Sequence, residues 1–292
     1  MSELKKVIEA DALFIENKLE SLLSTNNISD GKMAEAMRYA ILGGGKRIRA
    51  FLTVEFCKLF GGNAEDAANY ACALEMVHGY SLVHDDLPCM DNDDMRRGKP
   101  SCHKAFGETV ALLAGDALLT YAFEVCAKAD LPAKKNAMAV KTLAECAGAV
   151  GMCKGQELDL MLDCPDYESL KVLHNKKTGE LIRAAATLGY IASPKAFDKA
   201  VAEKITEYAL SLGLAFQIED DLLDVRSTTE ELGKPVGSDE KNGKKTVLSY
   251  MTVEEAEDEA KRLSEYASSQ FSSIDGSQIV SELPIYLLAR KK

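Results

Sequence analysis

Several features are scarce in this sequence of 292 residues, and each scarcity excludes a class of protein. Basic residues are outnumbered, 35 Lys and Arg against 46 Asp and Glu, and the net charge of −11 argues against nucleic-acid binding. The eight cysteines form no C-x-x-C pair, which argues against a zinc site and a disulfide framework. No uncharged run reaches the roughly 18 residues of a membrane-spanning helix, since Asp116 interrupts the apolar stretch TVALLAGDALLTYAF. We therefore expect a cytoplasmic protein with reduced cysteines, no transmembrane segment and no secretory signal.

Strand signals are also scarce, because alternating β-branched runs are nearly absent. Apolar residues recur instead at three- and four-residue steps, as in LKKVIEADALFIENKLESLL, and AEAMRYAILGG ends its helical pattern at glycine. We expect the seven prolines, at positions 88, 100, 132, 165, 194, 235 and 284, to fall where helices break. The pattern predicts an all-α fold, an antiparallel helical bundle that forms a single domain over residues 1–292.

Charge is most concentrated in VHDDLPCMDNDDMRRGKPSCH, residues 83–103. Five aspartates and three basic residues occupy positions 85–99, with no glutamate among them. Pro88 disfavours a helix at the residue before it, so Asp91 can join Asp85 at one site only if the chain turns between them. His78 lies seven residues before Asp85, about 20° away around a helix, and so faces the same site.

A second acidic group ends the apolar segment GLAFQIEDDLLDV, in which Asp221 follows Asp220 directly. On a helix, Asp220 and Asp224 lie about 40° apart and Gln217 lies about 60° from Asp220, so the three side chains share one face. The apolar residues around them leave little surface for water. Carboxylates at such a place need either cations or protons.

Two groups of short oxygen donors, without histidine or cysteine at ligand spacing, favour a hard divalent cation, and Mg²⁺ is the first choice. Arg96, Arg97 and Lys99 follow the first group at once. Basic side chains there would bind the outer oxygens of a diphosphate that bridges the metal ions. The sequence therefore predicts a metal–diphosphate site.

With these residues in place, the chain resembles the trans-isoprenyl diphosphate synthase (polyprenyl synthetase) family, and is most like its bacterial farnesyl diphosphate synthases. The first aspartate-rich motif reads DDLPCMD, with two additional residues between its aspartates, and the second reads DDLLD after FQIE. Further matching segments are GGGKRIRA, MRRGKP, LAGDALL, HNKKTGELIRAA and LGKPVGSDEKNGKKT. They occur in the family's order between about residues 43 and 246.

The resemblance implies the isoprenoid synthase fold, a homodimer of helical bundles with a deep central cavity, and three Mg²⁺ ions. The implied metal ligands are the aspartates of the two motifs, Asp85, Asp86 and Asp91 in the first and Asp220, Asp221 and Asp224 in the second. The basic side chains implied for the allylic diphosphate are Arg96, Lys177, Lys234 and Lys244. Those implied for isopentenyl diphosphate are Lys46, Arg49, His78 and Arg97. Thr178 and Gln217 would lie beside the reacting carbon, and Lys177 would complete the catalytic group.

The implied reaction joins isopentenyl diphosphate to dimethylallyl or geranyl diphosphate by Mg²⁺-assisted ionisation, condensation and proton loss. Tyr80 and Ser81, five and four positions before the first aspartate, would close the pocket at the fifteen-carbon product, trans-farnesyl diphosphate. The alternatives are a geranylgeranyl diphosphate synthase, a terpene cyclase and a non-catalytic regulatory subunit. Lys46, Arg49 and Arg97 argue against the cyclase, because cyclases usually lack isopentenyl contacts.

Overall fold

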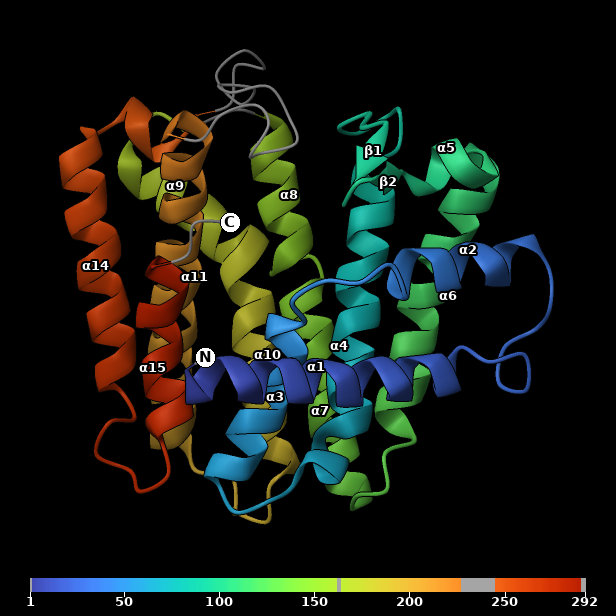
Figure 1. Cartoon of the computed structure of the whole chain (residues 1–292), viewed down its shortest axis with the longest axis horizontal. Coiled ribbons are helices and arrows are strands. Elements are labelled where there is room, and N and C mark those ends of the chain that lie inside the picture. The colour runs from blue at the N-terminus through green and yellow to red at the C-terminus, as the bar shows by residue number, and fades with distance from the viewer. Residues whose placement is uncertain (1, 162–163, 227–244, 290–292) are drawn as a thin grey trace. The chain divides into compact units, whose positions relative to one another are not determined.

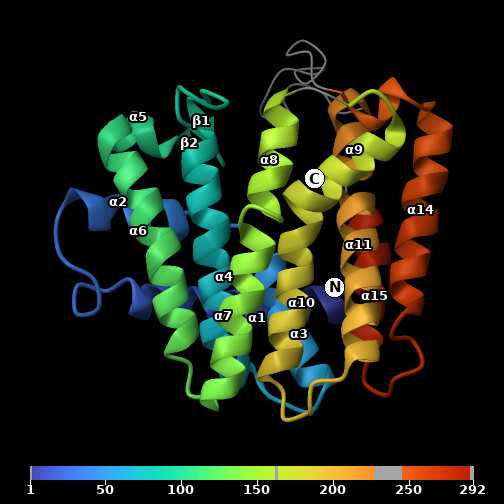
Figure 2. The same cartoon turned by 180° about the vertical axis from the view of Figure 1, so that it is seen from behind.

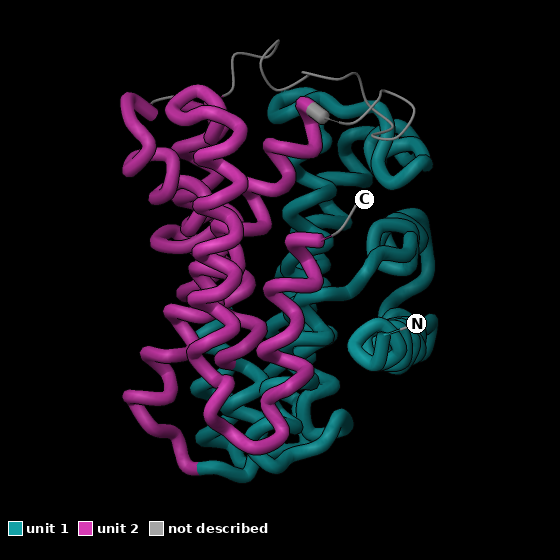
Figure 3. The backbone as a smooth tube through the Cα atoms, turned by 60° about the vertical axis from the view of Figure 1, so that its left-hand side comes forward, with its two compact units in different colours: residues 1–143, 188–195 teal, residues 144–187, 196–292 magenta. Residues whose placement is uncertain are grey.

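The computed structural model describes residues 2–161, 164–226 and 245–289. These residues form helices joined by short connections, so the all-α prediction is confirmed (Figure 1). Within the described ranges, the strands are β1 (Met95–Arg96) and β2 (Lys99–Pro100), which pair antiparallel as a small hairpin. The chain divides into unit 1, residues 1–143 and 188–195, and unit 2, residues 144–187 and 196–292 (Figure 3). The single-domain organisation stays a prediction.

Unit 1 is built around two buried helices. Its elements are α1 (Glu3–Leu22), α2 (Lys32–Ile41), α3 (Ile48–Leu59), α4 (Ala64–Asp85), the hairpin, α5 (Cys102–Phe106), α6 (Glu108–Ala127) and most of α7 (Ala133–Ala147). Residues 50–57 of α3 are all buried, and α4 packs against both α3 and α6 (Figure 2). Asn63 caps α4, because its side chain accepts the Asp66 N–H while the Asp66 carboxylate accepts the Asn63 N–H. Because α4 is buried, the position of its last turn, where the first acidic motif begins, is fixed within the unit.

Helix α6 bears on the expectation that the chain has no transmembrane segment. Within the described residues, α6 alone is long and apolar enough to cross a membrane. A core helix of a soluble protein meets the same criterion, and α6 packs along α4. The side chain of Asp116, in the middle of α6, is 61% exposed. The expected absence of a transmembrane segment therefore stays a prediction.

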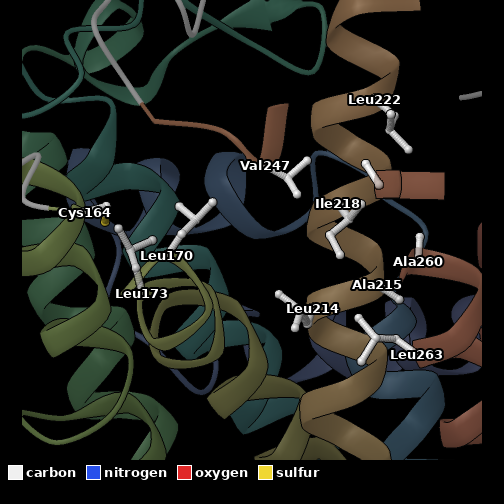
Figure 4. Close-up of a cluster of buried hydrophobic side chains, with 11 residues drawn as sticks. Cys164, Leu170, Leu173, Leu214, Ala215, Ile218, Leu222, Val247, Ala260 and Leu263 are labelled. Carbon is white, nitrogen blue, oxygen red and sulfur yellow. The ribbon is translucent and has the colours of Figure 1, made fainter. Parts of the chain in front are cut away.

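Unit 2 is organised by one long helix. Its elements are α8 (Met152–Met161), α9 (Tyr167–His174), a π-helical turn η1 (Asn175–Gly179), the first part of α10 (Glu180–Ala192), α11 (Lys199–Arg226), the 3₁₀ turn η2 (Val247–Ser249), α14 (Val253–Ser269) and α15 (Gln278–Leu288). Helix α11 packs against α14, α15 and η1. Leu214, Ile218 and Leu222 lie in a buried apolar cluster that also contains Val247 (Figure 4). This cluster holds the end of α11 that carries the second acidic motif.

The expectation that every proline marks a helix break is wrong at Pro284, which lies inside α15. Proline has no N–H and cannot donate the helical hydrogen bond to the carbonyl four residues earlier. That carbonyl belongs to Val280, and it accepts a hydrogen bond from the buried Tyr208 hydroxyl at 2.9 Å. A side chain of α11 thus replaces the donor that proline removes, which a pattern of local breakers does not reveal.

Candidate active site

The first acidic motif begins where α4 ends. The helix stops at Asp85, and the chain then turns so that the Asp91 N–H donates to the Asp85 carbonyl at 2.8 Å. Asn92 completes the turn with a left-handed backbone, φ 54°. The turn predicted from Pro88 is therefore present, and it folds the two additional residues of DDLPCMD back toward the helix end.

The second aspartate of this motif is paired with the hairpin. Asp86 is 1% exposed, and its two carboxylate oxygens accept three hydrogen bonds of 2.6–2.8 Å from the Arg96 guanidinium. Burial raises the pKa of Asp86, and Arg96 opposes that rise. Arg96 lies in β1, and the tight hairpin continues with left-handed Arg97 and Gly98. Part of the repulsion expected among the crowded aspartates is thus relieved by a bidentate arginine.

A cluster of cationic groups surrounds the glycine-rich loop at residues 43–47. An Arg49 guanidinium nitrogen lies 3.3 Å from His78 Nε2, and the Arg97 guanidinium donates to the Gly44 carbonyl. Gly45 has a φ of 137°, which favours glycine, and a Cβ there would lie 2.8 Å from the Arg97 guanidinium. Lys46 follows in the same loop. The structure therefore brings Arg49, His78 and Arg97 together around this loop, as expected for an anion site.

The electrostatics of this cluster also favour an anion. Burial lowers the pKa of His78 well below its ordinary value, and Arg49 and Arg97 lower it further. Burial likewise lowers the pKa of Arg97, with Arg47 adding repulsion. Arg49 is half-buried and Arg97 is exposed, and cations that repel one another in this way would be stabilised by a bound anion. Neutral His78 can donate a hydrogen bond to such an anion without a metal ion.

The second acidic motif lies on the last turns of α11. Asp221 and Asp224 are 6% and 5% exposed, and Asp220 is half-buried. One Asp221 oxygen accepts the Val247 N–H at 2.8 Å, which attaches η2 to the motif. Leu222 beside it is 1% exposed. The prediction of carboxylates at the end of an apolar helix is confirmed.

The residues predicted to lie beside the reacting carbon meet at the π-helical turn. The Thr178 hydroxyl donates to the Gln217 amide oxygen at 3.2 Å. Helix α9 continues through this turn into α10. A π-turn widens the helix and shifts its carbonyls, and such turns are frequent at functional sites. The Lys177 ammonium donates to Asp159 of α8 at 2.6 Å.

The predicted chain-length residues lie on α4, one turn before the motif. Tyr80 is 7% exposed, and its ring meets the His84 ring edge-on at 5.6 Å. The Ser81 hydroxyl donates to the His78 carbonyl at 2.9 Å. Lys234 and Lys244, the remaining predicted diphosphate contacts, lie outside the described residues.

Comparisons with known proteins decide the family. Residues 30–283 match the polyprenyl synthetase family model. The chain is also 39% identical over 292 residues to the farnesyl diphosphate synthase of Haemophilus influenzae. The aligned region covers 99% of this chain and 98% of that protein. The chain belongs to the polyprenyl synthetase family. The resemblance inferred from the motifs is therefore confirmed, and with it the trans-prenyltransferase family.

Other members of the family that resemble this chain are named for longer products. Geranylgeranyl pyrophosphate synthase 4 of Arabidopsis thaliana is 44% identical over 250 residues, 84% of this chain and 67% of that protein. A crystal structure of an FPP/GFPP synthase from Zymomonas mobilis superposes with a TM-score of 0.86 at 35% identity, covering 98% of this chain and 99% of that one. Family membership thus establishes the fold and the class of chemistry, and leaves the product length undecided.

Polyprenyl synthetases use Mg²⁺, and the donors of this chain fit that ion. Both motifs offer carboxylate oxygens alone, and Asp221 and Asp224 are nearly buried. Among the described residues, no three Asp, Glu, His or Cys side chains form a complete metal cage. Mg²⁺ usually binds through one or two carboxylates and completes its shell with water and substrate phosphate, so a cage is not required.

Three residues in these sites were missed by sequence reasoning. Asp159 accepts a hydrogen bond from Lys177. The segment QELD, residues 156–159, could have indicated it, because Gln156 and Asp159 lie on one face of a helix. Glu75 lies one turn before His78 on α4, and Arg47 lies between Lys46 and Arg49. Both could have been noticed as charges inside apolar or glycine-rich segments.

Proposed function

We propose that this prenyltransferase makes trans-farnesyl diphosphate from isopentenyl diphosphate and the allylic dimethylallyl and geranyl diphosphates. One observation carries the proposal. Unit 1 carries two separate groups of basic side chains that would suit two diphosphates, Arg96 beside the carboxylate of Asp86 and the cluster of Arg49, His78 and Arg97. A synthase needs both, because the allylic diphosphate departs with metal ions and isopentenyl diphosphate binds without them. A terpene cyclase needs only the first.

In this proposal the acidic motifs bind Mg²⁺ around the allylic diphosphate. Asp85 and Asp91, with Asp86, hold two ions, and Asp220, Asp221 and Asp224 hold a third. When bound, Mg²⁺ neutralises the negative charge that develops on the departing diphosphate. Arg96 and Lys177 add charge to the same group, together with Lys234 and Lys244. Lys46 joins the metal-free cluster that binds isopentenyl diphosphate.

The chain's own residues then shield the allylic cation. The Gln217 amide oxygen and the carbonyls displaced by the π-turn at Thr178 present oxygen dipoles to the carbon that becomes positive. The isopentenyl double bond attacks that carbon, the new carbon–carbon bond forms, and one proton leaves. The released diphosphate is a sufficient base, so the reaction needs no dedicated histidine or glutamate.

The product length depends in this proposal on Tyr80, which is nearly buried on α4. Tyr80→Ala should shift the product from fifteen carbons to twenty or more, measured by chromatography of dephosphorylated products. Ser81→Ala tests the second predicted chain-length residue, and we expect a smaller shift because the Ser81 side chain is small and its hydroxyl donates to the His78 carbonyl. Equal product lengths in Tyr80→Ala and the wild type would show that Tyr80 does not limit the chain. A wild type that already releases the twenty-carbon product would favour a geranylgeranyl diphosphate synthase.

One assay separates the remaining alternatives. The protein is mixed with geranyl diphosphate, labelled isopentenyl diphosphate and Mg²⁺, with a matched sample in EDTA. Elongation that EDTA abolishes supports the synthase, a cyclic hydrocarbon supports a cyclase, and no reaction supports a regulatory subunit. We also propose a homodimer, which light scattering of the purified protein tests. The exposed Leu112 and Leu113 of α6 are residues that a partner could cover. The cytoplasmic location stays a prediction.

A further inference from the structure

The glycine-rich loop before α3 has an unusual backbone. Gly44 and Gly45 have φ of 83° and 137°, and Arg47, which is not a glycine, has φ of 48°. A side chain in the left-handed region is strained and persists only where its surroundings hold it. Arg47 is also the residue from which α3 begins, since its carbonyl accepts the Phe51 N–H at 2.8 Å.

The Arg47 side chain is held by acids from two other helices. Its guanidinium donates to Glu16 of α1 at 2.9 Å and to Glu75 of α4 at 3.0 Å, and it also donates to the Ile41 carbonyl at the end of α2. The side chains of Arg47 and Glu75 are only 4% and 3% exposed. One guanidinium therefore joins α1, α2 and α4 to the loop.

Glu75 has a second task at the same place. Its other oxygen accepts the Ala50 N–H at 3.1 Å, which is one of the unpaired donors of the first turn of α3. No side chain from the loop caps this helix, so the cap comes from α4. Arg49 lies between the two groups that Glu75 binds. One turn further along α4, His78 contacts the Arg49 guanidinium at 3.3 Å.

We propose that Arg47, Glu75 and Glu16 form a positioning network that orients Lys46, Arg49 and His78 toward isopentenyl diphosphate. The inference rests on the proposed function and assigns roles to residues that do not themselves touch substrate. Arg47 fixes the loop on one side of Arg49, and Glu75 fixes the helix on the other. The network lies beside the cluster of Arg49, His78 and Arg97. Loosening the network should therefore weaken the binding of isopentenyl diphosphate and leave the binding of the allylic diphosphate unchanged.

The other end of α3 provides a matched control. There Lys58 donates to Asp11 of α1 at 2.9 Å and to Glu55 at 2.7 Å, and Asp11 is 5% exposed. Glu16 and Asp11 thus lie on the same helix, and each carboxylate binds a cation of the α3 region. Glu16→Gln removes an acid from the positioning network, whereas Asp11→Asn removes one from an ion pair with no predicted substrate contact nearby.

The test measures KM for each substrate separately, together with the melting temperature, for wild type, Glu16→Gln, Arg47→Lys and Asp11→Asn. In Glu16→Gln and Arg47→Lys we expect KM for isopentenyl diphosphate to rise by about tenfold or more. Misplacing a substrate-positioning group by about an ångström can lower an enzyme's rate by up to about a hundredfold. KM for geranyl diphosphate should stay unchanged. Asp11→Asn should lower the melting temperature without moving either KM.

Each other outcome is informative. If both KM values rise together, or if Asp11→Asn raises KM for isopentenyl diphosphate as much as Glu16→Gln does, the network is merely structural and the inference is wrong. If Arg47→Lys fails to fold, Glu16→Gln decides alone, because Glu75 still neutralises Arg47 in that variant. A wild type that does not elongate geranyl diphosphate overturns the proposed function itself, which distinguishes that failure from the failure of this inference.

Discussion

The pairing of Asp86 with Arg96 predicts which of the two side chains, when removed, lowers the stability of the fold more. The two side chains share three hydrogen bonds of 2.6–2.8 Å. Their exposure differs greatly, because the Asp86 side chain is 2% exposed and the Arg96 side chain 32%. When a partner is removed, the charge that remains can recover hydration only if water reaches it. The cost of the two deletions should therefore be unequal.

Arg96→Met leaves a buried carboxylate without its guanidinium, and breaking a buried ion pair in this way costs about 3–5 kcal/mol. Asp86→Asn leaves a guanidinium that is one-third exposed, so we expect a smaller loss of about 1–3 kcal/mol, the range for a polar group that loses its partner. The assay is urea unfolding of both variants and the wild type in EDTA, followed by circular dichroism. A loss in Asp86→Asn equal to or larger than that in Arg96→Met would refute the argument from exposure.

The pH dependence of stability gives an independent check that the buried Asp86 carboxylate causes the loss in Arg96→Met. Burial raises the pKa of Asp86 even with Arg96 present, and Arg96→Met removes the largest opposition to that rise. A carboxyl whose folded pKa exceeds its unfolded pKa destabilises the fold at neutral pH, and it ceases to do so as the pH falls through the folded pKa. The deficit of Arg96→Met against the wild type should therefore shrink as the pH falls through the raised pKa of Asp86. A constant deficit would mean that lost packing, and not the stranded charge, is responsible.

Three further predictions concern unit 2. Tyr208→Phe keeps the ring and leaves the Val280 carbonyl without its donor, so it should lower the free energy of unfolding in urea by about 1–3 kcal/mol. In a Pro284→Ala background a backbone N–H returns, and an equally large loss there would contradict the role given to Tyr208. Burial lowers the pKa of His174 to about 4, from an ordinary value near 6.5. Since the unfolded chain takes up that proton first, the wild type should lose up to about 3 kcal/mol between about pH 6.5 and about pH 4, and His174→Gln should not share this loss. A Cβ at Gly155 would lie 2.1 Å from the backbone of the π-helical turn; Gly155→Ala should raise KM for geranyl diphosphate, and an unchanged KM would show that the turn adapts freely.

Much of the candidate site followed from local sequence because its chemistry is local. The turn between Asp85 and Asp91 follows from Pro88, whose effect acts on the residue before it. The face shared by Asp224 and Gln217 follows from helix geometry. In each case the spacing along the chain carries the information.

The residues that escaped prediction depend on contacts between distant segments. Arg47 and Glu75 are 28 positions apart, and nothing near either residue indicates that they meet. The π-helical turn lies against Gly155 of α8, a contact that depends on tertiary packing. The Val280 carbonyl, which Pro284 deprives of its helical donor, accepts a hydrogen bond from Tyr208, 72 positions earlier in the chain. Local propensity cannot register such compensation.

The charges of this protein are arranged in pairs that a substrate could exchange. Arg96 binds Asp86, and Lys177 binds Asp159, each within one unit. Both cations are also the side chains proposed to bind the allylic diphosphate. A phosphate oxygen offers a guanidinium or ammonium the same kind of bond as a carboxylate does, with a higher charge. In the proposed function, a diphosphate that takes over Arg96 would release Asp86 as a Mg²⁺ ligand, so that metal and substrate would each favour the binding of the other.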